Sequence, residues 1–411
     1  ARKLVQDTNG VLHLIWHTQE SSLYRIRYAT STDQGATWNL QPDVTSSSLE
    51  TYHPALAVDD SYLYVAFPQK INTSTDAPYQ ILFTRKSVSG GGWSEPQALM
   101  GGTYNAVRPD LFLDPTNGRL HLVASGLDDN RSVYYRASGD QGANWTPLHS
   151  VDPTTSSTAS NSRYATVHAH GQNVYIAART VAPSFFITYY YLHTVRSVDG
   201  GETWFDQTKI SSYTAYLTGE YGVSLAGVGD RLYMAYEVGG GIYFRRFDDG
   251  VWSDYLQIST GAWPSITQTQ DGQAWLVWEQ DDNLMLGHYT GSAWDAPETL
   301  LAGNGLNQAH YPNLKLGLAS ENVIGAHTTC TGAPFSIVFD SIPAGGSPPP
   351  SPTSTSTPTV TSTTTPTATS TVTQTPTSTP TETPSPTPTS TDTPAPASTN
   401  TATPTATDAP A

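Results

Sequence analysis

Three stretches of this sequence share one motif: STDQGATW at Ser31–Trp38, SGDQGANW at Ser138–Trp145 and SVDGGETW at Ser197–Trp204. Asp and Gly favour tight turns, since the Asp carboxylate accepts hydrogen bonds from nearby backbone N–H groups and Gly supplies a positive φ. The Trp should fold back and pack between neighbouring sheets, where its large apolar area stabilises most. We therefore predict three equivalent β-hairpin turns, built from Asp33, Gly35 and Trp38, from Asp140, Gly142 and Trp145, and from Asp199, Gly201 and Trp204.

These turns belong to a longer repeat of about fifty residues. Its clearest strand occurs seven times, at Val11–Trp16, Tyr62–Phe67, Leu120–Ala124, Val174–Ala178, Leu232–Tyr236, Ala274–Trp278 and Asn322–Ala326. One strand precedes and another follows each copy, and in six copies a turn and a Trp then open a fourth strand. Four short antiparallel strands per unit are typical of a β-propeller blade. We predict an all-β propeller of four-stranded antiparallel blades, with seven blades favoured and six as the alternative.

The seventh repeat lacks a fourth strand. A ring closed by strands from both termini would explain this if the missing strand lies upstream of Ala1. The composition changes at residue 346, where the chain becomes almost purely Pro, Ser, Thr and Ala, without aromatic residues, Lys or Arg. Such a segment has too little apolar surface to offset its ordering entropy. We expect a propeller over 1–345 and a disordered stalk or linker over 346–411.

Charge and composition limit the function classes. A net charge of −16, from 35 acidic and 19 basic residues, disfavours nucleic acid and anionic membrane surfaces as partners. The single cysteine, Cys330, excludes an internal disulfide and a Cys-based zinc site. Ser/Thr/Pro-rich stalks are typical of exported proteins. We expect an extracellular or surface-displayed monomer without cofactors, whose signal peptide is not present in this chain.

The S-x-D-x-G-x-x-W motif resembles the Asp box, or bacterial neuraminidase repeat, of the sialidase-like superfamily. The resemblance covers Ala1 to about Ala344. In that family the box is structural and lies on the face opposite the active site, so the resemblance implies a structural role for these turns. Calcium binding by the acidic turns is the alternative. We expect no metal, because the Trp and the Gly already account for the motif without a bound ion.

Antiparallel order then indicates where a site could lie. If the Asp-box turns lie on the bottom face, the first strands start and the second strands end at the top face. Arg, Glu, His and aromatic residues gather at those positions, and they suit a sugar site, although a water-filled channel mouth also accepts polar residues without any ligand. The candidate ligand-binding residues are His53, Tyr164, Trp263, Glu279 and Tyr311.

The resemblance also raises sialidase chemistry, with a Tyr nucleophile activated by a Glu, an Asp acid/base and three Arg that clamp the substrate carboxylate. If the protein is an enzyme, the catalytic candidates are Arg108, Arg163, Arg179, Glu220, Tyr221 and Glu237, with Asp128 or Asp129 as the acid. The Arg-Ile-Pro motif is absent, since Arg2 precedes Lys3 and Leu4, and the three arginines fall on adjacent blades.

We therefore expect recognition of a glycan or a related extracellular ligand at the top face. Sialidase-type hydrolysis is the alternative, and another polysaccharide-active enzyme on the same scaffold is the second alternative.

Overall fold

The computed structural model describes residues 2–126, 133–154, 161–183, 188–215, 222–269, 271–302, 308–316, 323–330 and 336–342. The segments of regular structure in this part of the chain are β-strands. A search of the same residues finds no helix long and apolar enough to cross a membrane. The predicted tail over 346–411 lies outside the described residues.

The strands form antiparallel sheets, each built from strands that follow one another along the chain. The first three sheets contain β1 (Arg2–Gln6), β2 (Leu12–Glu20), β3 (Leu23–Ser31) and β4 (Asn39–Ser47); β5 (Ala55–Val58), β6 (Tyr62–Lys70), β7 (Tyr79–Ser87) and β8 (Gln97–Gly101); and β9 (Ala106–Leu113), β10 (Leu120–Gly126), β11 (Val133–Ser138) and β12 (His149–Val151).

The fourth and fifth sheets contain β13 (Asn161–His170), β14 (Asn173–Pro183), β15 (Thr188–Ser197) and β16 (Phe205–Ala215); and β17 (Val223–Val228), β18 (Arg231–Val238), β19 (Gly241–Asp248), β20 (Val251–Trp252) and β21 (Leu256–Thr260). In the fifth sheet both β20 and β21 pair with β19. The last two sheets contain β22 (Ala262–Gln268), β23 (Ala274–Gln280), β24 (Asn283–Tyr289) and β25 (Glu298–Leu301); and β26 (Gln308–Leu316), β27 (Val323–Cys330) and β28 (Ser336–Ile342).

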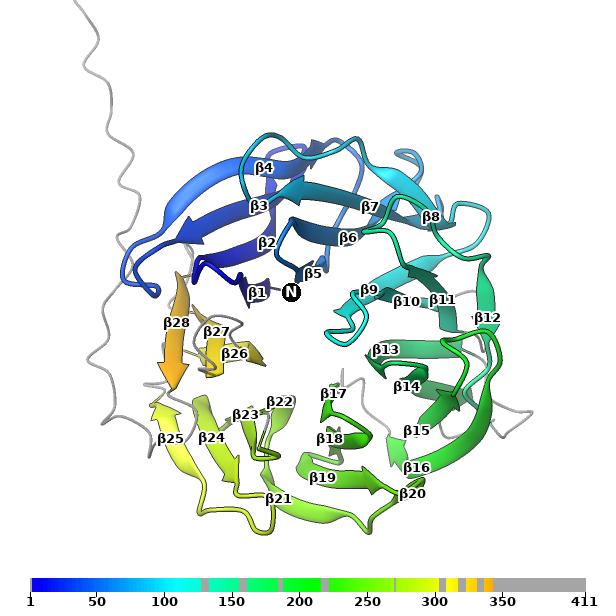
Figure 1. Ribbon diagram of the computed structural model, residues 1–411, viewed down its shortest axis with the longest axis vertical. Helices are drawn as coiled ribbons and strands as arrows, with labels where there is room; N and C mark the ends of the chain where they lie inside the picture. The colour runs from blue at the N-terminus through cyan, green and yellow to red at the C-terminus, as the bar shows by residue number, and fades with distance from the viewer. Residues whose placement is uncertain are drawn as a thin grey trace, which may run out of the picture. The chain divides into compact units, whose positions relative to one another are not determined.

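The sheets succeed one another around a ring (Figure 1). The first strand of each sheet contacts the first strand of the next, and β26 contacts β1 to close the ring. At this closure the backbone N–H of Leu4 donates to Asn313 Oδ1 at 3.2 Å. The predicted all-β propeller of antiparallel blades is confirmed.

Within the described residues, complete blades of four or more strands number six, which is the alternative count rather than the favoured seven. The seventh repeat forms the three-stranded sheet β26–β28, and the described residues of this repeat contain no fourth strand. The described residues do not test whether a strand upstream of Ala1 completes this sheet.

The three hairpin turns contain the same hydrogen bonds. In the first turn, Asp33 Oδ1 accepts the N–H of Thr37 at 2.8 Å and the Ser31 hydroxyl at 2.7 Å, while Ser31 Oγ accepts the N–H of Gly35 at 2.8 Å. The turns at Asp140 and Asp199 repeat this pattern. Hydrogen bonds from the Thr37 side chain and backbone lower the pKa of Asp33 to about 2. Each carboxylate thus satisfies the backbone of its own turn.

The Trp that ends each turn packs against the preceding blade. Trp145 meets Phe83 of the second sheet edge-on, with ring centroids 5.0 Å apart, and Trp204 meets Tyr135 of the third sheet at the same distance. The turn glycine lies against the same ring. Gly142 has φ of 81°, and a Cβ there would stand 2.4 Å from Phe83 Cζ. The turns therefore connect successive blades as well as successive strands.

Candidate functional site

The top face is the face at which the first strand of each blade starts and the second strand ends. The strand register pairs these two positions directly: Arg163 at the start of β13 lies opposite Arg179 near the end of β14, and Ala262 at the start of β22 lies opposite Glu279. The hairpin turns join third strands to fourth strands, and antiparallel order therefore places them at the other end of each blade.

A left-handed backbone residue recurs at the top face. His53, Arg108, Tyr164 and Trp263 have φ of 45°, 51°, 54° and 55°, at equivalent positions of four blades. The strand register slips at this point in β9, β13 and β22, where two residues face one on the second strand. A β-bulge of this kind re-aims a side chain, and a non-glycine residue in this conformation costs about 1–3 kcal/mol.

The same bulge thus recurs at the top face, with a non-glycine left-handed residue in four blades. The register of β26 slips between His310 and Asn313, so Tyr311 occupies the equivalent backbone position. Its side chain lies outside the described part of the chain. Sequence reasoning selected these positions because the first strands start at the top face, but it did not anticipate the positive φ.

Over the first four blades the top face combines cationic and aromatic side chains. The Arg108 guanidinium lies over the Tyr164 ring, 4.0 Å from its centroid. The His53 ring stands 5.0 Å from Tyr52 and 5.9 Å from His17. Burial lowers the pKa of His53, and the positive charge of Arg108 lowers it further. The His53 imidazole is therefore neutral at physiological pH and able both to donate and to accept a hydrogen bond.

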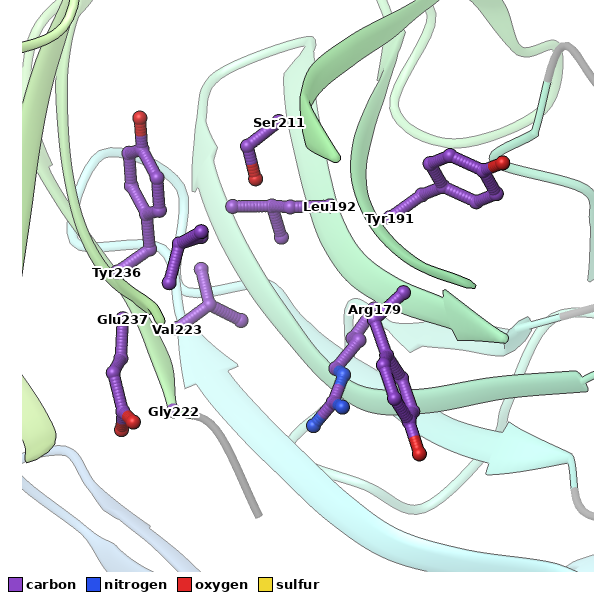
Figure 2. Close-up of a pocket in the computed structure, with 10 residues that line it drawn as sticks. Arg179, Tyr191, Leu192, Ser211, Gly222, Val223, Tyr236 and Glu237 are labelled. Atoms are coloured by element: carbon purple, nitrogen blue, oxygen red, sulfur yellow. The ribbon is translucent and has the colours of Figure 1, made fainter. Parts of the chain in front are cut away.

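A cleft opens between the fourth and fifth blades, with a volume of about 370 Å³ including its open mouth. Its walls are mostly apolar or aromatic, and its lining residues are Arg179, Tyr190, Tyr191, Leu192, Ser211, Gly222, Val223, Tyr236, Glu237 and Val238. Figure 2 shows the Arg179 guanidinium and the Glu237 carboxylate at one end of the cleft and Ser211 at the other. Arg179 lies over the Tyr190 ring, 3.9 Å from its centroid.

Glu237 is the most perturbed acid of this face. Glu237 is only 9% exposed, and Trp263 donates its backbone N–H to Glu237 Oε2 at 3.4 Å. Burial raises the pKa of Glu237 to about 7; the negative charge of Glu279 adds to the rise, while the Trp263 N–H and Arg179 oppose it. A carboxyl whose pKa lies near neutral pH can act as a general acid or as a hydrogen-bond donor.

The remaining candidate site residues do not gather at one place. Arg163 is exposed, although its backbone lies opposite Arg179. Glu279 is half-buried at the end of β23. The other sialidase-type candidates, Glu220, Tyr221, Asp128 and Asp129, lie outside the described residues. The structure thus brings Arg179, Glu237 and Glu279 into one neighbourhood, and it places Arg108 with His53 and Tyr164 in another.

A search for metal sites in the described ranges finds no group of three His, Cys, Asp or Glu side chains that could hold an ion.

Comparison with known proteins gives information on the fold of this chain. No family model and no curated protein matches this chain. Among solved structures, an ulvan lyase from a new family of polysaccharide lyases, bound to -[GlcA(1-4)Rha3S]-, aligns with a TM-score of 0.54 and 12% identity over 82% of this chain and 90% of that chain. The NanB sialidase of Streptococcus pneumoniae aligns with a TM-score of 0.46 and 9% identity over 79% of this chain and 86% of that one.

An α-L-arabinanase of Penicillium chrysogenum complexed with arabinobiose aligns with a TM-score of 0.47 and 13% identity, over 71% of this chain and 93% of that one. With a TM-score above 0.5 at 12% identity, the likeness to the ulvan lyase shows a shared fold and no more than that.

Proposed function

We propose that this protein is an exported propeller that recognises a glycan at its top face. The observation that carries the proposal is the recurring left-handed bulge, which sets His53, Arg108, Tyr164 and Trp263 at equivalent positions of four blades. Half-buried aromatic rings beside fixed hydrogen-bonding groups suit a sugar, whose faces are apolar and whose rim is polar. The ulvan lyase, which aligns over most of this chain, is bound to an oligosaccharide on the same fold.

Two features support assignment to the Asp-box group of propellers. The hydrogen-bonded turns at Asp33, Asp140 and Asp199 share one sequence motif and one hydrogen-bond geometry. They also lie at the opposite end of the blades from the proposed site, as the resemblance implies. The Ser/Thr/Pro-rich stretch after residue 346 would then hold the propeller away from a cell surface.

A glycan array tests the proposal with two matched pairs of variants. Trp263→Ala should lower the affinity for the best glycan at least tenfold, whereas Tyr255→Ala, which removes an exposed aromatic ring from the outside of the fifth blade, should not. Arg108→Ala should weaken binding, whereas Arg231→Ala, at the start of β18 and thus at the bottom face, should not. Equal effects within each pair, or no bound glycan, would refute the proposal.

Sialidase-type hydrolysis is the second candidate, favoured by a buried Arg179 that shares a tyrosine-lined cleft with Glu237. Arg108 and Arg179 each lie over a tyrosine ring, and Arg163 is exposed. A fluorogenic sialoside separates this candidate from simple recognition. Turnover that disappears in Tyr221→Phe would support sialidase chemistry and would contradict a purely binding role; an uncleaved sialoside would exclude that chemistry.

A further inference from the structure

Two adjacent blades present a glutamate at the same position of their second strands. Glu237 follows Tyr236 near the end of β18, and Glu279 follows Trp278 near the end of β23. The start of β22 connects them. Ala262 lies opposite Glu279 in the sheet, and the next residue, Trp263, donates its N–H to Glu237 Oε2 at 3.4 Å.

The two carboxyl groups have different surroundings. Glu237 lies at the end of a mostly apolar cleft and is only 9% exposed, whereas Glu279 is half-buried at the channel mouth. Burial raises the pKa of Glu237 to about 7, with the charge of Glu279 as a further contribution. Two carboxyl groups in different environments are a recurring arrangement of acid and base in glycosidases.

The cleft supplies the other groups that a sugar-cleaving site needs. Arg179 approaches Glu237 from β14 and would stabilise the carboxylate that remains after proton donation. Tyr190 and Tyr191 approach from β15, and Tyr236 from β18. Arg179 and Glu279 are the charged groups that act on Glu237, and the three tyrosines line the same cleft.

We propose that Glu237 and Glu279 form the acid–base pair of a glycoside hydrolase site at the top face. The inference rests on the proposed recognition of a glycan and goes beyond it. Glu237 donates its proton to the glycosidic oxygen as the bond from that oxygen to the anomeric carbon breaks. Glu279 accepts a proton from the water whose oxygen forms the new bond to the anomeric carbon. The products are two sugars with free hydroxyls, and proton exchange with solvent restores both carboxyl groups.

This assignment differs from sialidase chemistry in its residues. It uses two carboxyl groups on neighbouring blades and no tyrosine nucleophile. Arg179 acts as a positioning residue, because it acts through Glu237. Trp263 donates its backbone N–H to Glu237, and in this proposal its ring stacks on the sugar being cleaved.

The test uses the full chain and the glycans of the array, labelled at the reducing end with a fluorophore, with products separated by chromatography and weighed by mass spectrometry. The wild type should cleave at least one glycan that it binds. Glu237→Gln and Glu279→Gln should each lower kcat by about 10²–10⁴-fold while binding persists. The matched control is Glu298→Gln, an exposed glutamate on the outer strand β25, which should keep full activity.

Two further measurements do not depend on how well the glutamine variants fold. The wild-type kcat/KM should fall as the pH rises above about 7, because the acid must be protonated in the free enzyme. Azide should restore turnover to Glu279→Ala and release a glycosyl azide, a rescue that a structural role would not produce.

The outcomes separate the two proposals. Glycans that bind and stay intact would overturn the acid–base pair and leave recognition standing. Cleavage that survives Glu237→Gln or Glu279→Gln would also overturn it. If no glycan binds, the proposed recognition fails and takes the inference with it.

Discussion

Substituting a turn glycine by alanine measures how much the contact between neighbouring blades contributes to the free energy of unfolding. Gly142→Ala adds one methyl group at a residue with φ of 81°, and that methyl would stand 2.4 Å from Phe83 Cζ. Phe83 is 3% exposed, stacks on Tyr64 and meets Trp145 edge-on, so its ring has little room to move. The backbone term costs about 1–2 kcal/mol, and overpacking adds about 1–3 kcal/mol. We expect Gly142→Ala to lower the free energy of unfolding by about 2–5 kcal/mol.

Gly250→Ala is the matched control for this substitution. Gly250 has φ of 83° but no heavy atom within 4 Å of the added Cβ, so only the backbone term of about 1–2 kcal/mol applies. Urea titration followed by tryptophan fluorescence measures both losses. Phe83→Leu should make room for the methyl group and recover part of the loss in a double variant. Equal losses for Gly142→Ala and Gly250→Ala, without recovery, would refute the idea that the glycine admits the neighbouring ring.

Three further predictions concern the scaffold. Trp204→Ala should lower the free energy of unfolding by about 3–5 kcal/mol in the same titration, because it removes the ring that packs on the preceding blade; a loss below about 1 kcal/mol would contradict that role. The folded-state pKa of Asp33 is about 2, below its ordinary value, so the stability that its carboxylate contributes should be complete above about pH 4 and disappear as the pH falls through 2. Circular dichroism measures this loss of stability in acid. Asp33→Asn should reduce the pH dependence of stability, and the exposed control Asp254→Asn should not. The protein should elute as a monomer in size-exclusion chromatography with light scattering, and a stable dimer would contradict the expectation.

Much of the fold could be predicted because its determinants are local. Each alternating strand and each Asp–Gly turn is specified by residues within about ten positions, and a propeller repeats these units in order. The missing fourth strand of the seventh repeat was likewise visible in the sequence, although the favoured count of blades included that repeat. The hydrogen bonds of Asp33 within its own turn followed from the same local chemistry.

The site was harder to predict because it depends on the packing of one blade against the next. Their place near the start of a first strand selected Arg108 and Trp263, but their left-handed φ arises only when the first strand slips against the second. The cleft between β14 and β18 buries Glu237, and no local pattern reports the burial that raises its pKa. Likewise, the stacking of Arg108 on Tyr164 joins two repeats that are more than fifty residues apart.

A crystal structure of the protein with the tightest glycan from the array would test the central claim most directly. The account predicts a sugar at the top face, with a ring stacked on Trp263 or Tyr164 and hydroxyl groups within hydrogen-bond distance of Arg108, Arg179 or Glu237. A glycan bound on the outside of a blade, or at the bottom face beside the Asp33, Asp140 and Asp199 turns, would contradict it.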